Sequence, residues 1–181
     1  MNNTKNKKIV FASMFAALAC AATFIKIPVP SMTNGYVNLG DCFVLLAGFF
    51  MGPLYGGLAA GIGSALTDII SGYIHYAPAT LVIKFLMAFT AAIISKNLKK
   101  RLPVSIAYII SAVVGEIIMI AGYFSYELVI YGMGAFGSIF GNLIQGIAGC
   151  ISSVAIAIIL TKNKSIMQLF ESLNKDSKKN V

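Results

Sequence analysis

Six apolar runs, divided by short polar or basic stretches, constrain what this chain can fold into more than any other feature. A helix needs about 20 consecutive apolar residues to span a bilayer. Hydrophobic residues make up 58% of the chain and charged residues only 11%, whereas soluble domains carry about 25% charged residues. The sequence therefore predicts an all-α integral membrane protein. The expected helices cover residues 9–25, 42–52, 54–73, 79–95, 104–124 and 136–160.

The second run is too short to cross a bilayer alone, so the helix count depends on Gly52 and Pro53. A continuous helix over 42–73 would give five crossings, whereas a break at this pair would give six. Basic residues cluster at 5–8, 96–101 and 162–164. Six crossings place all three clusters on one side, as the positive-inside rule requires. We therefore expect six transmembrane helices in a single domain, 1–181, with cytoplasmic tails 1–8 and 162–181.

The basic balance of the chain fits the same topology. A net charge of +8 follows from the positive-inside pattern and from attraction to anionic lipid, without nucleic acid as a partner. The first apolar run follows a short basic stretch but lacks an evident small-residue cleavage site. We therefore expect it to stay in the protein as a helix rather than to be removed as a signal peptide.

Three ionisable side chains lie inside the apolar runs: Asp68, Lys84 and Glu116. A charge at membrane depth costs at least a few kcal/mol, so such residues usually face a protein interior and mark a substrate or ion path. With a rise of about 1.5 Å per residue, the predicted topology places all three in the outer half of the membrane. Asn142 and Gln145, three residues apart on one helix face, lie at a similar depth. The sequence thus predicts a polar binding site inside the membrane.

A structural role is the alternative for each of these groups. An ion pair between Lys84 and Glu116 would hold the bundle together without a ligand. Hydrogen bonds from Asn142 and Gln145 to other helices would do the same. Asp68 continues a face of small residues on its helix, which favours close packing against a neighbouring helix. We therefore assign Asp68 as structural or substrate-binding.

Tyrosines are concentrated at the predicted outer ends of the helices. An aromatic belt would decorate both membrane interfaces, whereas a one-sided group suits a pocket lined by rings and a few polar groups. Anchoring of helix ends is the alternative for several of them. The outer tyrosines are Tyr36, Tyr73, Tyr76, Tyr123, Tyr126 and Tyr131, and the inner ones are Tyr55 and Tyr108.

The stretch 26–41, between the first two runs, is longer than a simple connection needs. Pro28 and Pro30 stiffen its start, while Gly35 and Gly40 permit tight turns. The stretch could therefore fold over a pocket as a lid. Asp41 stands where the second helix begins. We expect it to cap that helix, with direct ligand contact as the alternative.

Several motifs together resemble a known family. They are GYVNLGD at 35–41, MGP at 51–53, GSALTD at 63–68, and GY at 72–73 leading to YAPATLVIK at 76–84. They resemble the substrate-binding S component of an energy-coupling factor (ECF) vitamin transporter. The most similar group is the riboflavin type, whose relatives are also assigned to hydroxymethylpyrimidine and pyridoxine uptake. The resemblance extends from the first helix to the last.

The resemblance implies a six-helix subunit that captures a water-soluble vitamin from outside the cell. Such a subunit works with a membrane coupling (T) subunit and two cytoplasmic ATPase subunits. The chain contains no Gly-x-x-x-x-Gly-Lys-Ser/Thr phosphate loop, so ATP hydrolysis would come from those partners. The family docks its coupling subunit through small residues on the first helix. Small-x-x-x-small spacing, which permits close helix approach in lipid, occurs at Ala12, Ala16, Ala17 and Ala21, with packing inside the chain as the alternative.

We expect the ligand to be a small aromatic B vitamin: pyridoxine, hydroxymethylpyrimidine or riboflavin. The charged and amide groups at middle depth slightly favour the two smaller vitamins, while the family label favours riboflavin. No cofactor is expected. The predicted substrate-binding residues are Tyr36, Asn38, Asp41, Tyr76, Lys84, Glu116, Tyr123, Asn142 and Gln145. Like Asp68, His75 is assigned as structural or substrate-binding.

A stand-alone secondary carrier is the main alternative. Such carriers commonly contain two internal repeats, and no convincing repeat is visible between the halves of this sequence. An enzyme finds little support, because Cys20, Cys42 and Cys150 are far apart without a Cys-x-x-Cys pattern. His75 is the chain's one histidine, and a lone histidine is a poor candidate for a metal ligand set. The sequence therefore predicts neither catalytic nor metal-binding residues.

Overall fold

Helices make up nearly all of the protein in the computed structural model, which describes residues 3–28 and 36–175. Side chains are described from residue 5 to 25 and from 38 to 174. Helices α1 to α6 lie on the predicted apolar runs, which confirms the all-α prediction apart from one short hairpin. The elements are α1 (Asn3–Phe24), β1 (Lys26–Pro28), β2 (Tyr36–Asn38), α2 (Gly40–Met51), α3 (Pro53–Ile70), α4 (Ala77–Leu98), α5 (Val104–Tyr131), the 3-10 turn η1 (Gly132–Ala135), α6 (Phe136–Lys162) and α7 (Lys164–Lys175).

Long apolar helices give the molecule the character of a membrane protein. Within the described residues, three helical stretches are long and apolar enough to cross a bilayer: Lys5–Phe24, Ala77–Leu98 and Val104–Lys162. The third stretch contains both α5 and α6. The apolar helix α2 has only 12 residues, which is less than a full crossing requires. The number of crossings, and the side of the membrane on which the termini lie, stay predictions.

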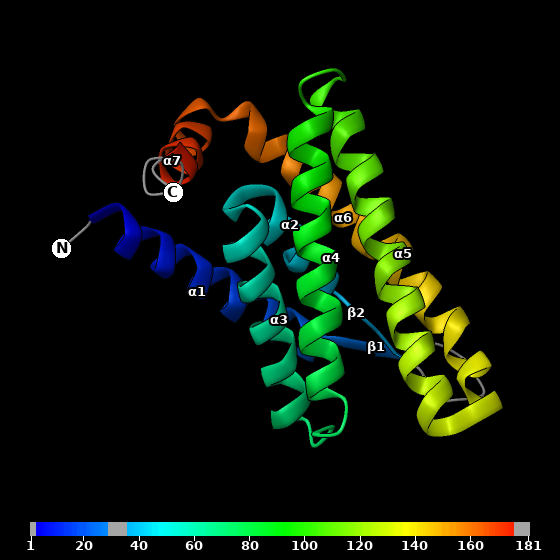
Figure 1. Cartoon of the computed structure of the whole chain (residues 1–181). Helices are drawn as coiled ribbons and strands as arrows, with labels where there is room; N and C mark the ends of the chain where they lie inside the picture. Colours follow the sequence, from blue (N-terminus) through cyan, green and yellow to red (C-terminus); the bar gives the residue numbers. More distant parts are fainter. Residues whose placement is uncertain (1–2, 29–35, 176–181) are drawn as a thin grey trace.

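Helix α2 forms the centre of the bundle. It contacts α1, α3, α4 and α6, and all of its residues except Phe43 are buried. The outer helices form a sequential path around it, with α1 against α3, α3 against α4, α4 against α5, and α5 against α6 (Figure 1). A helix this short depends for its stability on packing against the neighbouring helices. Its side chains therefore set the positions of the surrounding helices.

The predicted break between the second and third helices is confirmed. Helix α2 ends at Met51, and α3 begins at Pro53. Gly52 between them has a φ of 78°, a left-handed conformation that glycine adopts without steric cost. Pro53 suits the first turn of α3, where its missing N–H costs no hydrogen bond. The two helices then pack closely, because a Cβ on Gly56 would lie only 2.5 Å from the carbonyl oxygen of Ala47.

The bundle has two unlike ends. At one end, which we call the α7 end, α7 lies beside the start of α1 and the junction of α2 with α3 (Figure 1). At the opposite end, which we call the pocket end, α3 leads into α4, and α5 leads into α6 through η1. Because α3 to α6 alternate in direction, each contributes one terminus to each end (Figure 1). Residues near the end of α3 and α5 can therefore contact residues near the start of α4 and α6 at the pocket end.

The α7 end is filled by aromatic and aliphatic side chains. The ring of Phe170 lies 4.9 Å from that of Phe50 and 5.8 Å from that of Phe11, measured between centroids. Asn174 Nδ2 donates a hydrogen bond of 2.9 Å to the backbone oxygen of Phe50. Helix α7 lies in the stretch 162–181, for which the sequence predicts a cytoplasmic tail. Helix α7 was missed because its apolar residues alternate with polar ones at helical spacing and form no continuous apolar run.

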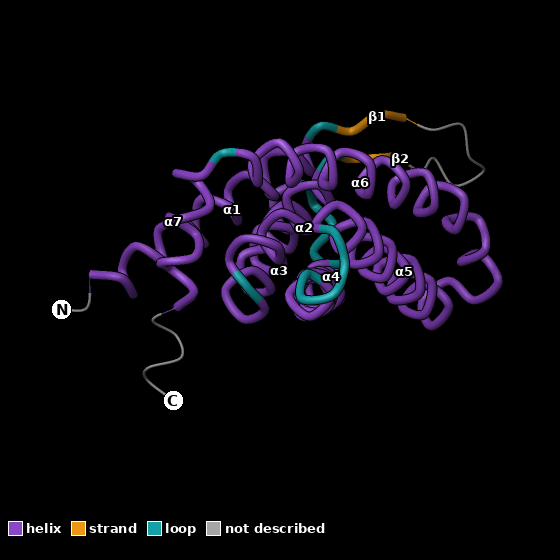
Figure 2. The backbone as a smooth tube through the Cα atoms, turned by 90° about the horizontal axis from the view of Figure 1, so that it is seen from above, coloured by secondary structure: helices purple, strands orange, loops and turns teal. Residues whose placement is uncertain are grey.

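A small antiparallel hairpin follows α1 at the pocket end. Strand β1 pairs with β2 so that Lys26 opposes Asn38, and β2 contacts α6 (Figure 2). The hairpin thereby brings the segment before α2 against α6, a helix about a hundred residues later in the chain. Residues 29–35 lie outside the described part of the chain. The lid predicted for this stretch therefore stays a prediction.

Candidate functional site

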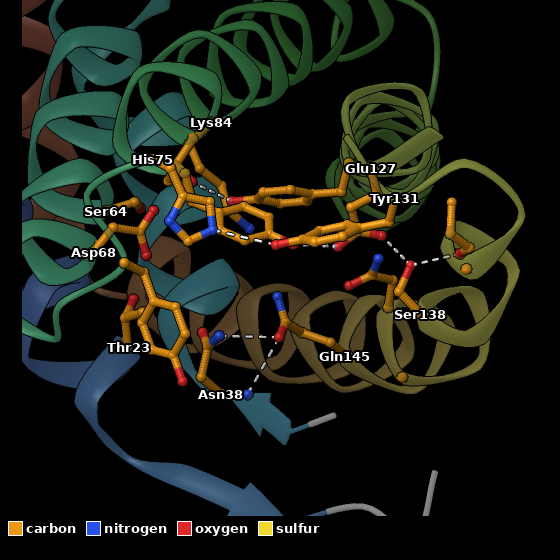
Figure 3. A pocket seen from close by; sticks show the side chains of 18 residues that line it. Thr23, Asn38, Ser64, Asp68, His75, Lys84, Glu127, Tyr131, Ser138 and Gln145 are labelled. Carbon is orange, nitrogen blue, oxygen red and sulfur yellow. Dashed lines mark hydrogen bonds between the residues drawn. The ribbon is translucent and has the colours of Figure 1, made fainter. Parts of the chain in front are cut away.

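The pocket end encloses a cavity of about 580 Å³. Side chains from α1, β2, α3, α4, α5 and α6 line it, together with the segment between α3 and α4 (Figure 3). Its volume lies within the range of about 300–1,000 Å³ that is typical of small-molecule sites. Eight of the sequence-predicted residues line the cavity: Asn38, Asp68, His75, Tyr76, Lys84, Tyr123, Asn142 and Gln145.

A chain of polar contacts forms the floor of the cavity. Lys84 Nζ forms an ion pair with Asp41 Oδ1. Gln145 Nε2 donates to Asp41 Oδ2 at 2.7 Å. Asn38 Nδ2 in turn donates to Gln145 Oε1 at 3.0 Å (Figure 3). These contacts join α4, α2, α6 and β2, and they hold the lysine and both amides in fixed orientations before any ligand arrives.

Asp41 lies in the first turn of α2 and points into the protein interior rather than capping the helix. Helix α2 begins at Gly40, and Leu39 takes the capping position without a side-chain cap. The N–H of Gly40 instead donates to Asn38 Oδ1 at 2.9 Å. Asp41 is fully buried, with 0% of its surface exposed. The expected capping role for Asp41 was therefore wrong. The start of α2 is pressed against α1, since a Cβ on Gly40 would lie 2.1 Å from Thr23 Oγ1, and this packing directs the first turn into the bundle.

Glu116 lies behind the floor and does not line the cavity. Neither of its carboxyl oxygens has a hydrogen-bond partner among the described residues. Two glycines of α6 leave room for the Glu116 side chain. A Cβ on Gly149 would lie 2.3 Å from Glu116 Oε1, and one on Gly146 would lie 3.4 Å from Glu116 Oε2. The ion pair considered between Lys84 and Glu116 is not formed. Lys84 pairs with Asp41 instead.

Rings and one carboxylate form the mouth of the cavity. Tyr76 donates to Glu127 Oε1 at 3.2 Å, and Ser138 Oγ donates to Glu127 Oε2. His75 Nε2 lies 3.3 Å from the hydroxyl of Tyr131 (Figure 3). Burial raises the pKa of Tyr76, which precedes α4, so its hydroxyl keeps its proton and remains a donor. These contacts connect the segment before α4 to α5 and α6.

Tyr123 forms a wall between the floor and the mouth. Its hydroxyl donates to Thr80 Oγ1 at 3.0 Å, and Lys84 Nζ lies 5.4 Å from the centre of its ring. That distance is within the range of a cation–π interaction. A planar ligand in the cavity would therefore find an aromatic surface beside a fixed cation and fixed amides.

The remaining predicted binding residues are Asp41, Glu116 and Tyr36. Asp41 and Glu116 support the floor from behind and do not touch the cavity. Tyr36 belongs to β2, but its side chain is outside the described part of the chain. The roles of all these residues in binding stay predictions.

Several cavity residues were missed by the sequence analysis, although a helical pattern could have indicated them. Thr80 lies four residues before Lys84 on α4, while Glu127 and Tyr131 continue the face of Tyr123 at spacings of four. Residues at this spacing share one face of a helix. Glu127 escaped notice because the fifth helix was expected to end at residue 124, whereas α5 continues to Tyr131. The missed side chains are Thr23, Ser64, Thr80, Glu127 and Ser138, whereas Tyr73 and Tyr131 belong to the outer tyrosines for which a pocket was predicted.

A second, shallower groove lies between α1 and α3 and is almost entirely apolar. All four alanines predicted to dock a partner line it: Ala12, Ala16, Ala17 and Ala21. Ala16 packs against α3, because a Cβ on Gly63 would lie 2.3 Å from its carbonyl oxygen. Ala17 and Ala21 are exposed. The four positions therefore divide between packing inside the chain and an open surface.

These features define a class: a multi-pass membrane protein with a polar and aromatic pocket at one end of an apolar helical bundle. Comparison with known proteins gives the particular family. Residues 3–163 match the ECF-type riboflavin transporter, S component, and the chain belongs to this family. It is therefore a vitamin-binding transporter subunit of the plasma membrane. The resemblance inferred from the motifs is confirmed.

Two relatives and one solved structure are similar to this chain over most of its length. A Pyrococcus woesei protein, described as an uncharacterized protein in the gap 3' region, is 35% identical over 147 residues, covering 81% of this chain and 95% of that protein. The riboflavin transporter RibU of Staphylococcus aureus (strain TCH60) is 32% identical over 137 residues, or 74% of this chain and 71% of RibU. The solved structure of the S component of a bacterial ECF transporter has a TM-score of 0.65 and 25% identity, and the match covers 87% of this chain and 97% of that one.

Proposed function

We propose that this chain captures riboflavin from outside the cell and hands it to an ATP-driven coupling module. The observation that carries the proposal is the preformed cavity of about 580 Å³, with aromatic walls and a floor of fixed amides. Riboflavin is a planar tricycle with a hydrogen-bonding edge and a hydroxylated side chain. Pyridoxine and hydroxymethylpyrimidine are single rings and would leave much of this volume unfilled. The S. aureus relative named as a riboflavin transporter supports the same choice.

The proposed contacts follow from the cavity's geometry. The tricycle would stack on Tyr76 or Tyr123, since stacked rings add to the energy of apolar burial. Asn142, one turn before Gln145 on α6, faces the same cavity and would bond the ring edge. Lys84, Gln145 and Asn38 are already oriented by Asp41 and by one another. Such preorganisation favours tight binding because little side-chain freedom is lost when the ligand enters.

The charge distribution supports the proposed direction of capture. Lys8 Nζ lies 4.7 Å from the Tyr55 ring, and Lys99 Nζ lies 4.0 Å from the Tyr108 ring, both at the α7 end. The basic end of α6, at Lys162, lies there too. The positive-inside rule assigns such an end to the cytoplasm. The cavity at the opposite end would then open to the outside, and both predicted tails would be cytoplasmic.

Ligand binding is tested on the purified full chain in detergent. Native mass spectrometry would identify any vitamin that co-purifies, and quenching of riboflavin fluorescence would give a dissociation constant. Gln145→Ala should weaken binding at least tenfold, because it removes a fixed amide and leaves Asp41 Oδ2 without its donor. Gln168→Ala, at an exposed position of α7, is the matched control and should leave affinity unchanged. The proposal fails if neither riboflavin, pyridoxine nor hydroxymethylpyrimidine raises the melting temperature.

The apolar groove between α1 and α3 is the surface we propose for the coupling subunit, which works with two cytoplasmic ATPase subunits. The exposed Ala17 offers close approach to a partner helix. Ala17→Leu should abolish co-purification with the coupling subunit while riboflavin binding stays normal. Ala121→Leu, an exposed alanine on α5, is the matched control. Normal assembly of the Ala17 variant would count against this surface, and uptake without any coupling subunit would favour a stand-alone carrier.

A further inference from the structure

We propose that the pocket admits the free vitamin and rejects its phosphate ester, with Glu127 as the residue that distinguishes them. The inference rests on the proposed vitamin-binding function and adds the ligand's charge and the group that recognises it. It applies to each candidate vitamin, because riboflavin, pyridoxine and hydroxymethylpyrimidine all carry a primary hydroxyl that phosphorylation converts to a monoester.

The cation of the cavity is already neutralised. Lys84 is the one lysine, and no arginine joins it, among the described residues that line the cavity. Its ammonium is paired with Asp41, and the pair is buried, with 5% of Lys84 and 0% of Asp41 exposed. A phosphate would therefore compete with a carboxylate that the fold already holds in contact. The floor offers polar groups to a neutral ring edge but no spare positive charge.

Glu127 makes the mouth of the cavity favour a hydrogen-bond donor and disfavour an anion. Its two oxygens accept hydrogen bonds from Tyr76 and Ser138, and both donors are neutral hydroxyls. The described residues show no salt bridge to Glu127. A carboxylate has about four acceptor positions, so two stay available for a ligand. They suit the O–H of a primary alcohol, whereas a phosphate monoester brings up to two negative charges near pH 7 and would be repelled.

The helix that begins at the mouth of the cavity offers little compensation to a bound anion. The first N–H groups of a helix commonly bind phosphate, and α4 starts beside the cavity at Ala77. Pro78 has no N–H, however, and the N–H groups of Ala77 and Thr80 already donate to the backbone oxygens of Ile74 and Tyr76, which leaves only that of Ala79 in the first turn. In α6, the N–H of Phe136 is likewise bonded within η1. The mouth therefore recognises a donor and not an anion.

The test compares riboflavin with riboflavin 5'-phosphate on the full chain in detergent, using fluorescence titration. We expect the phosphate to bind at least tenfold more weakly to the wild-type protein. Glu127→Gln keeps the shape of the side chain and replaces an acceptor by a donor. It should weaken riboflavin binding several-fold and strengthen phosphate binding, so that the ratio of the two dissociation constants falls at least fivefold. Glu171→Gln, an exposed acid on α7, is the matched control and should leave the ratio unchanged.

Each outcome separates this inference from the proposed function. Equal affinity for riboflavin and its phosphate in the wild-type protein, or an unchanged ratio in Glu127→Gln, would overturn the role of Glu127 while leaving riboflavin capture intact. If riboflavin does not bind, the same comparison is made with pyridoxine and hydroxymethylpyrimidine and their phosphates. Failure of every free vitamin to bind would remove both proposals. The wild-type ratio tests the rejection of the phosphate ester even if the variant does not fold.

Discussion

The α7 end and the pocket end are built from the same six apolar helices, yet one is filled and the other is hollow. At the α7 end, Phe50, Tyr108 and Phe170 pack ring against ring, and Tyr108 is fully buried. At the pocket end, Lys84, Asp41 and Gln145 are buried in a polar chain beside a cavity. The comparison shows that aromatic packing holds the α7 end together, whereas an ion pair and hydrogen bonds hold the polar groups of the pocket end in fixed positions.

Breaking the ion pair at the pocket end should have the largest effect. Lys84→Ala leaves the Asp41 carboxylate buried without its cation, which typically costs about 3–5 kcal/mol. The free energy of unfolding in mild detergent should fall by that amount, and riboflavin binding should be lost. Lys96→Ala, at an exposed position of α4, should change neither quantity. Normal stability of the Lys84 variant would show that Asp41 finds another partner.

Removing an aromatic side chain at the α7 end should affect stability alone. Phe170→Ala creates a cavity among Phe11, Phe15 and Phe50, and the loss should be about 3 kcal/mol. Affinity for riboflavin should stay within about twofold, because the change lies at the opposite end of the bundle. Leu169→Ala, which is partly exposed on the same helix, is the control for a general effect on α7. A large loss of affinity in Phe170→Ala would mean that the two ends are energetically coupled.

The sequence predicted the positions of helices α1 to α6 better than the contacts at the pocket end. Apolar runs and the Gly52 and Pro53 break depend on local chemistry, and α1 to α6 lie on the expected runs, whereas the amphipathic α7 was missed. The partner of Lys84 depended on packing: Asp41 and Glu116 are both carboxylates near its depth, and only the start of α2 at Gly40 decides between them. Glu127 was missed for a related reason, since it lies on a part of α5 that was expected to be a loop.

Replacing both partners of the ion pair would sharpen the contrast between stability and function. Asp41→Leu combined with Lys84→Met substitutes apolar groups for a buried pair, and such exchanges are often neutral or stabilising. We expect the free energy of unfolding to lie within about 2 kcal/mol of the wild-type value, in contrast to the single Lys84 variant. Riboflavin binding should nevertheless be lost, because Gln145 loses its acceptor. Retained affinity in the double variant would show that the ion pair does not orient the floor.

The smallest effect is expected from Glu116→Gln. Glu116 lies behind the floor, makes no hydrogen bond with the described residues, and occupies space left by Gly146 and Gly149. An amide of the same shape should therefore change the free energy of unfolding by less than about 1 kcal/mol and riboflavin affinity by less than about twofold. Glu116→Ala, which removes the volume as well, should cost more in both measurements. A strong loss of affinity in the glutamine variant would mean that the carboxyl of Glu116 acts on the ligand by its charge rather than by filling space.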